Sequence, residues 1–91
     1  MTDEWTWDYA FQAEDQASYP EVVRDEVKAM ADQIADLANL GIDPSELGEP
    51  TPGTARRHTL PCGGWFETQA LPRLRPRLIA VVLVVPPPHL L

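Results

Sequence analysis

The chain has 91 residues and a formal net charge of −7, with 14 acidic side chains against seven lysines and arginines. A chain of this length holds one hydrophobic core of modest size, so a single domain over residues 1–91 is expected. The negative charge excludes a protein that coats nucleic acid non-specifically, because the polyanion would be repelled overall.

The charge is unevenly distributed along the sequence. Residues 1–50 contain thirteen acidic and two basic side chains, whereas residues 51–91 contain one acidic side chain and five arginines. The first part therefore carries −11 and the second part +4, which together give −7. A local arginine patch in the second part could bind phosphate or an acidic peptide despite the net charge.

The same composition bears on compartment and cofactors. Cys62 is the only cysteine, so no internal disulfide forms, and one cysteine with two distant histidines cannot build a closed metal site. The longest apolar run, 78–85, is far shorter than the roughly 20 residues of a membrane-spanning helix. Because no basic-then-apolar leader is present either, we expect a cytoplasmic protein with no membrane anchor, metal or cofactor.

The first half of the sequence predicts one strand followed by one long helix. Aromatic residues alternate with small or polar ones over 5–11, which is the period of a strand whose aromatic face covers a helix. Ser18 and Glu21 fit a capping box at the start of a helix of about 20 residues, and Gly41 ends it as a left-handed C′ residue. Apolar residues recur every three or four positions and form the expected buried stripe: Val23, Val27, Met30, Ala31, Ile34, Leu37 and Ala38.

The second half predicts a small sheet. After a helical turn at 43–47 and a loop at 49–54, strands are expected at 55–60, 65–71 and 78–85. A Gly63-Gly64 turn and an arginine-rich turn join them into an antiparallel meander, with the last strand in the middle of the sheet because it is apolar on both faces.

The predicted fold class is therefore α+β. A small antiparallel-rich sheet, made of the N-terminal strand and the C-terminal three-strand meander, carries one long helix on one face. One core is expected to join helix and sheet, from the side chains of Trp5, Trp7, Val23, Val27, Ile34, Leu37, Phe66, Ile79 and Val81.

This order of elements resembles the RelE/ParE superfamily of toxins from bacterial toxin–antitoxin pairs. The resemblance covers residues 5–85, including a Leu47-Gly48 loop that leads to a strand with Arg56 and Arg57, and it leaves a proline-rich tail at 86–91. It implies a growth inhibitor that acts either as a ribosome-associated mRNA ribonuclease or by protein contact. It also implies a cognate antitoxin-like partner protein.

Three features depart from the family pattern and favour an alternative function. The strand at 65–71 lacks the family's arginine–tyrosine pair, the helix is acidic instead of basic, and Pro86-Pro87-Pro88 replaces the basic-aromatic ending. The alternative is a non-catalytic protein-interaction module of the same fold, in which the partner surface persists without catalysis.

Four residues are candidates for ribonuclease chemistry. Arg56 or Arg57 would stabilise the extra charge on a phosphorane, and strand alternation places the two on opposite faces. Glu67 would accept the proton of the attacking 2′-hydroxyl, and His89 would protonate the leaving 5′-oxygen. The competing interpretation is a charged strand edge that prevents aggregation and a tail histidine in solvent.

A second group of cations lies in the last turn. Arg73, Arg75 and Arg77 are spaced by two residues, so they could project together and bind RNA phosphate or an acidic partner. The competing interpretation is a solvated turn whose charges balance the acidic helix.

Overall fold

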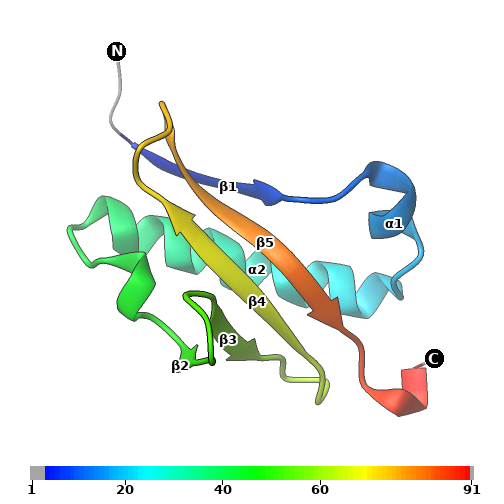
Figure 1. The fold of residues 1–91 in the computed structure, drawn as a ribbon. Coiled ribbons are helices and arrows are strands. Elements are labelled where there is room, and N and C mark those ends of the chain that lie inside the picture. Colours follow the sequence, from blue (N-terminus) through cyan, green and yellow to red (C-terminus); the bar gives the residue numbers. More distant parts are fainter. Residues whose placement is uncertain (1–3, 91) are drawn as a thin grey trace.

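The structure, a computed structural model, describes residues 4–90. It is an α+β fold in which a five-stranded mixed, mostly antiparallel sheet carries one long helix on one face (Figure 1). The elements in chain order are β1 (Trp5–Tyr9), α1 (Ala13–Ala17), α2 (Glu21–Asn39), η1 (Pro44–Glu46), β2 (Glu49–Pro50), β3 (Arg56–Thr59), β4 (Trp65–Leu71), β5 (Arg77–Val85) and η2 (Pro88–Leu90).

The strands are arranged in the order β1-β5-β4-β3-β2. The pairs β2–β3, β3–β4 and β4–β5 are antiparallel, whereas β1 pairs with β5 in parallel. The predicted meander is confirmed, and so is the inner position of the last strand, which has the N-terminal strand beside it at the sheet edge. The sequence did not indicate β2, because its two residues lie in the proline-containing segment expected to be a loop.

Helix α2 packs its apolar side against the sheet and forms the core. The almost completely buried side chains of the sheet include Phe66, Ile79 and Val81, and those of the helix are Val23, Val27, Ala31, Ile34, Ala35 and Ala38. The prediction that Leu37 belongs to this core is wrong, because 37% of its surface is exposed. The small Ala35 takes its place, since the stripe is centred on Val27, Ile34 and Ala38 and Leu37 lies at its margin.

The predicted start of α2 is wrong, whereas its predicted end is confirmed. The expected capping box is wrong: Pro20 is the N-cap without a side-chain hydrogen bond, and Ser18 instead closes α1 by donating from Oγ to the Asp15 carbonyl at 2.6 Å. At the other end, Gly41 has a φ of +101°, and the Ile42 N–H donates to the Leu37 carbonyl at 3.1 Å. This is a Schellman motif, so the predicted glycine terminus is confirmed.

Side-chain hydrogen bonds attach β1 to α2. Asn39 accepts from the Trp5 N–H at 2.6 Å and donates to the Trp5 carbonyl at 3.1 Å. Trp7 donates its indole N–H to Asp32 at 2.7 Å, which together with the Lys28 hydrogen bond lowers the pKa of Asp32. The aromatic side of the first strand therefore covers the helix, as its alternation predicts.

The opposite side of the sheet is not covered by another element among the described residues. In Figure 1, α2 lies behind β4 and β5, and nothing lies in front of them. β5 is therefore covered by a helix on one face only, although it is apolar on both, and on the other face the small Ala80 is still only 5% exposed. Val82 is the extra residue of a bulge opposite Glu67 and Thr68, and Val82 and Leu83 are each 40% exposed.

Candidate interaction surface

The side chains that point away from α2 form one continuous surface, here called the open face. Residues paired across neighbouring strands share a face, and Phe66 and Thr68 of β4 are buried on the α2 side. The residues that alternate with them along β4, and the residues paired with those on β3 and β5, therefore line the open face. They are Arg57, Trp65, Glu67, Gln69, Leu71, Leu78, Ala80, Leu83 and Val85, with Val82 of the bulge.

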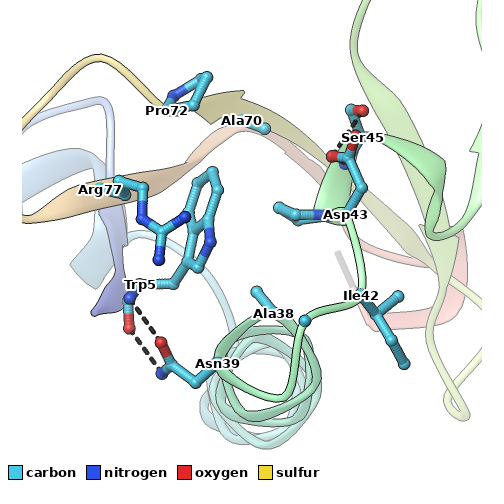
Figure 2. A pocket seen from close by; sticks show the side chains of 11 residues that line it. Trp5, Ala38, Asn39, Ile42, Asp43, Ser45, Ala70, Pro72 and Arg77 are labelled. Carbon is cyan, nitrogen blue, oxygen red and sulfur yellow. Dashed lines mark hydrogen bonds between the residues drawn. The ribbon is translucent and has the colours of Figure 1, made fainter. Parts of the chain in front are cut away.

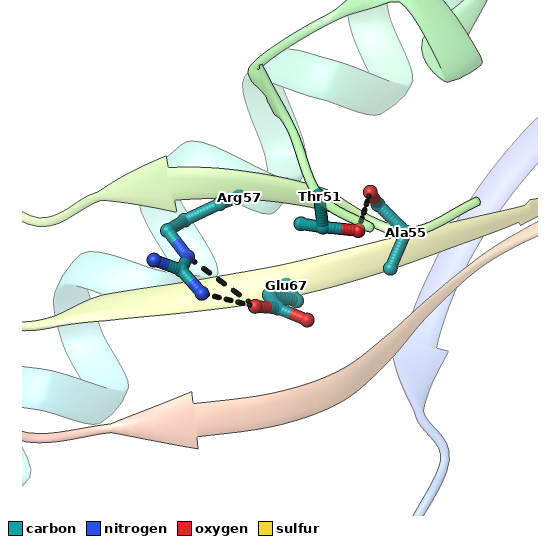
Figure 3. A network of polar contacts seen from close by, with 4 residues as sticks. All are labelled: Thr51, Ala55, Arg57 and Glu67. Atoms are coloured by element: carbon teal, nitrogen blue, oxygen red, sulfur yellow. Dashed lines mark hydrogen bonds and ion pairs between the residues drawn. The ribbon is translucent and has the colours of Figure 1, made fainter. Parts of the chain in front are cut away.

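A stacked cluster of Arg57, Trp65 and Glu67 lies on this face. Arg57 and Glu67 are directly paired between β3 and β4, and two guanidinium nitrogens of Arg57 donate to Glu67 Oε2 at 3.0 and 3.3 Å (Figure 3). The same guanidinium lies 3.8 Å from the centroid of the Trp65 ring. Arginine and tryptophan are the residue types most enriched at the centres of protein interfaces.

The second predicted arginine, Arg56, lies on the other face and has a structural contact. Its Nε donates to the Ser45 carbonyl at 2.6 Å and its Nη1 to the Gly48 carbonyl at 3.4 Å. Arg56 therefore holds η1 against β3. The two arginines point to opposite sides of the sheet, as alternation predicts, so they do not converge on one phosphate.

His58 shares the face of Arg56 and is part of the core. Its ring stacks on Phe66 at a centroid distance of 5.0 Å, and Nε2 forms a 2.9 Å hydrogen bond with Thr68 Oγ1. Burial, with a smaller contribution from the charge of Arg56, lowers the pKa of His58. The backbone of Gly48 covers the ring so closely that an added Cβ would lie 2.6 Å from His58 Cε1.

The predicted acid–base pair is not brought together. Glu67 lies in the middle of β4, with its carboxylate bonded to Arg57. His89 is exposed in η2, which follows the end of β5 after Pro86 and Pro87. Of the four predicted catalytic residues, the structure therefore places only Arg57 and Glu67 in contact with one another.

The predicted clamp of the last turn is also divided. Arg73 is exposed at the β4–β5 hairpin, and Arg75 donates to the carbonyls of Pro72 and Leu74 at 2.9 and 2.8 Å. Arg77 is turned to the helix side of the sheet, with its guanidinium carbon 4.9 Å from the centroid of the Trp5 ring. The three cations therefore do not form one phosphate site.

Arg77 and Trp5 line a cavity of about 580 Å³ between the end of α2, η1 and the edge of the sheet (Figure 2). The polar side chains of its wall bond to neighbours: Asn39 to the backbone of Trp5, and Asp43 to Ser45 through 2.8 and 2.9 Å hydrogen bonds. Those bonds from Ser45 also lower the pKa of Asp43. The wall thus secures the helix end and offers no acid–base pair for catalysis.

Within residues 4–90, no group of three histidine, cysteine, aspartate or glutamate side chains lies close enough together to hold a metal ion. No helix in this part of the chain is both long and apolar enough to span a membrane.

Comparisons of the chain with protein-family models, with curated proteins and with solved structures found no match. The open face is therefore the structural observation that bears on function, and the resemblance remains an expectation from the sequence.

Proposed function

We propose that this chain is a RelE/ParE-like member of a toxin–antitoxin pair that acts by binding a partner protein through the open face. One observation carries the proposal: the sheet surface opposite α2 presents apolar side chains that no described element covers. Exposed apolar surface of this kind marks protein-binding sites on small domains. The cluster of Arg57 and Trp65 adds the residue types that contribute most binding energy at interfaces.

The separation of the predicted catalytic residues also supports a role in binding. A ribonuclease of the expected kind needs a base, an acid and a charge-stabilising group around one phosphodiester. Here Arg56 bonds to the loop at η1 and His89 lies beyond β5. Binding needs no such constellation, so the open face serves a partner without any rearrangement.

A second candidate function, ribonuclease activity, is favoured by the contact between Arg57 and Glu67. A carboxylate and a guanidinium on one surface could accept the 2′-hydroxyl proton and stabilise the phosphorane. The ion pair opposes this function, because the Glu67 oxygen that would accept the proton already accepts two hydrogen bonds from Arg57.

Growth of a bacterial host during induced expression tests the proposal. We expect expression to slow growth and Leu83→Asp to relieve the effect, because a carboxylate on the open face prevents apolar contact. Val22→Asp is the matched control, since Val22 is similarly exposed (43%) but lies on α2. Normal growth at high soluble expression would contradict toxicity. Relief by Glu67→Gln together with continued inhibition by Leu83→Asp would favour the ribonuclease.

A further inference from the structure

The apolar part of the open face has a definite position. Leu71 and Leu78 are paired near one end of the β4–β5 ladder, and Trp65 and Val85 are paired at the other. Val82 and Leu83, the most exposed of these residues, lie between them at the bulge. An occupant must therefore supply apolar side chains along β5 and at the two ends of β4, whose middle residues on this face are Glu67 and Gln69.

Apart from the Arg57–Glu67 pair, the charges around this strip are separated by sign: acids lie along its two sides and cations at one end. The carboxylate of Glu67 offsets the charge of Arg57, so this central pair is neutral as a unit. Asp8 lies on the same face beside Ala80, and Glu49 lies beside Arg57 at the other side of the sheet. Both of these flanking acids are exposed. The opposing cations, Arg73 and Arg75, are confined to the hairpin at one end.

The charge of the whole molecule selects among possible occupants. A second copy would bring two chains of net charge −7 together, and like charges across an interface oppose association. An acidic segment would meet the same repulsion at Asp8 and Glu49. A basic segment would be attracted over long range and would place its cations beside these two acids.

We infer that the open face binds a partner-protein segment with apolar side chains on one side and a net positive charge. The inference rests on the proposed function, because it assigns the chemistry of the partner at that same surface. The segment lays its aliphatic side chains along Leu78, Leu83 and Val85. Its lysines or arginines flank the strip and pair with Asp8 and Glu49.

Two synthetic amphipathic peptides test this inference. They share the same leucine and valine positions, and every polar position is lysine in one and glutamate in the other. We expect the lysine peptide to bind at least tenfold more tightly, and to weaken as salt shortens the screening length from about 30 Å at 0.01 M to about 8 Å at 0.15 M. Backbone amide shifts should change along β4 and β5 and not along α2.

Leu83→Asp provides a sharp control. It adds a negative charge, which would strengthen binding of the lysine peptide if attraction to acidic side chains were the whole interaction. We expect it to abolish binding instead, because it disrupts the apolar strip, while Val22→Asp leaves binding unchanged. Retained binding by Leu83→Asp, or shifts confined to α2, would overturn the docking site.

The remaining outcomes separate this inference from the proposed function. Equal binding of both peptides would refute the basic partner while leaving the open face as a protein-binding surface. A dimer in sedimentation that Leu83→Asp dissociates would show that a second copy covers the face, which also refutes it. Absence of peptide binding together with growth inhibition that Leu83→Asp relieves would refute the partner chemistry alone.

Discussion

At the scale of single residues, His58 illustrates how context decides the role of a side chain. Next to two arginines on a short strand, a histidine suggests chemistry on a charged surface. In the fold it stacks on Phe66 and bonds to Thr68 beneath the Gly48 backbone. In the described part of the chain no negative charge compensates a proton on this ring, and the positive charge of Arg56 opposes protonation. The fold therefore holds the neutral imidazole.

The stability of the protein should consequently depend on pH through His58. The pKa of His58 is lowered in the folded state, whereas the unfolded chain has a histidine pKa of about 6.5. Below that value the unfolded state binds more protons, so the free energy of unfolding should fall as the pH drops from about 7 to 5. Urea denaturation at several pH values measures this change.

His58→Gln is the control for this pH dependence, since glutamine keeps a hydrogen-bonding group near Thr68 but does not titrate in this range. We expect the variant to lose most of the change between pH 7 and 5. Asp32 and Asp43 do not contribute to the change between pH 7 and 5. Their pKa values are lowered in the folded state, so the stability that they contribute is lost at more acidic pH, around and below the ordinary aspartate value of 3.8. An unchanged pH profile in His58→Gln would refute the assignment.

At the scale of the elements, helix α2 offers a test of which side is buried. Ile34→Asp should abolish cooperative unfolding, because burying an unpaired carboxylate costs several kcal/mol against a total stability of about 5–15 kcal/mol for a domain. Leu37→Asp, three residues further on, should remain folded because Leu37 is partly exposed. Thermal unfolding followed by circular dichroism compares the two. A cooperatively folded Ile34→Asp protein would mean that the buried side is wrongly assigned.

The elements were largely predictable because each one follows from a local pattern. Periodicity indicates α2 and the strands of the meander, and Gly41 ends the helix by a mechanism that depends on one residue. The start of α2 was missed because Ser18 fits two local roles equally well: the N-cap of α2, or the C-cap that it takes up after α1. Leu37 was misplaced because a stripe of apolar residues does not reveal how wide its buried part is.

The candidate site was less predictable than the fold. The alternation of side chains between the two faces of a strand correctly places Arg56 and Arg57 on opposite sides of the sheet, since it depends only on strand geometry. The pairing of Arg57 with Glu67 depends on the register between β3 and β4, which the turn over 60–64 sets and which sequence patterns leave open. The contact of Arg56 with Ser45 joins residues eleven positions apart through a loop, and no local pattern encodes it.

At the scale of the whole molecule, the positive charges are dispersed over different surfaces. Arg57 is on the open face and paired with Glu67, and Arg56 and Arg77 are on the helix side of the sheet. The other arginines are Arg24 on α2 and Arg73 and Arg75 at the hairpin. With this distribution, residues 4–90 of a protein of net charge −7 form no continuous path of cations along which a strand of RNA could lie. This dispersal of the cations supports the proposed basic protein partner over a nucleic acid.

We therefore expect no measurable affinity for single-stranded RNA, even at low salt. Three or four arginines converging on one strand would instead give a slope of log affinity against log salt of roughly −2 to −3, at about −0.7 per neutralised phosphate. Fluorescence anisotropy with a labelled oligonucleotide makes the measurement. A control variant replaces the exposed Asp25 and Asp36 by asparagine, so that weak binding cannot be caused by repulsion from α2. Binding with a slope in that range, lost in Arg57→Ala, would show that RNA reaches the open face and would restore the ribonuclease as the leading function.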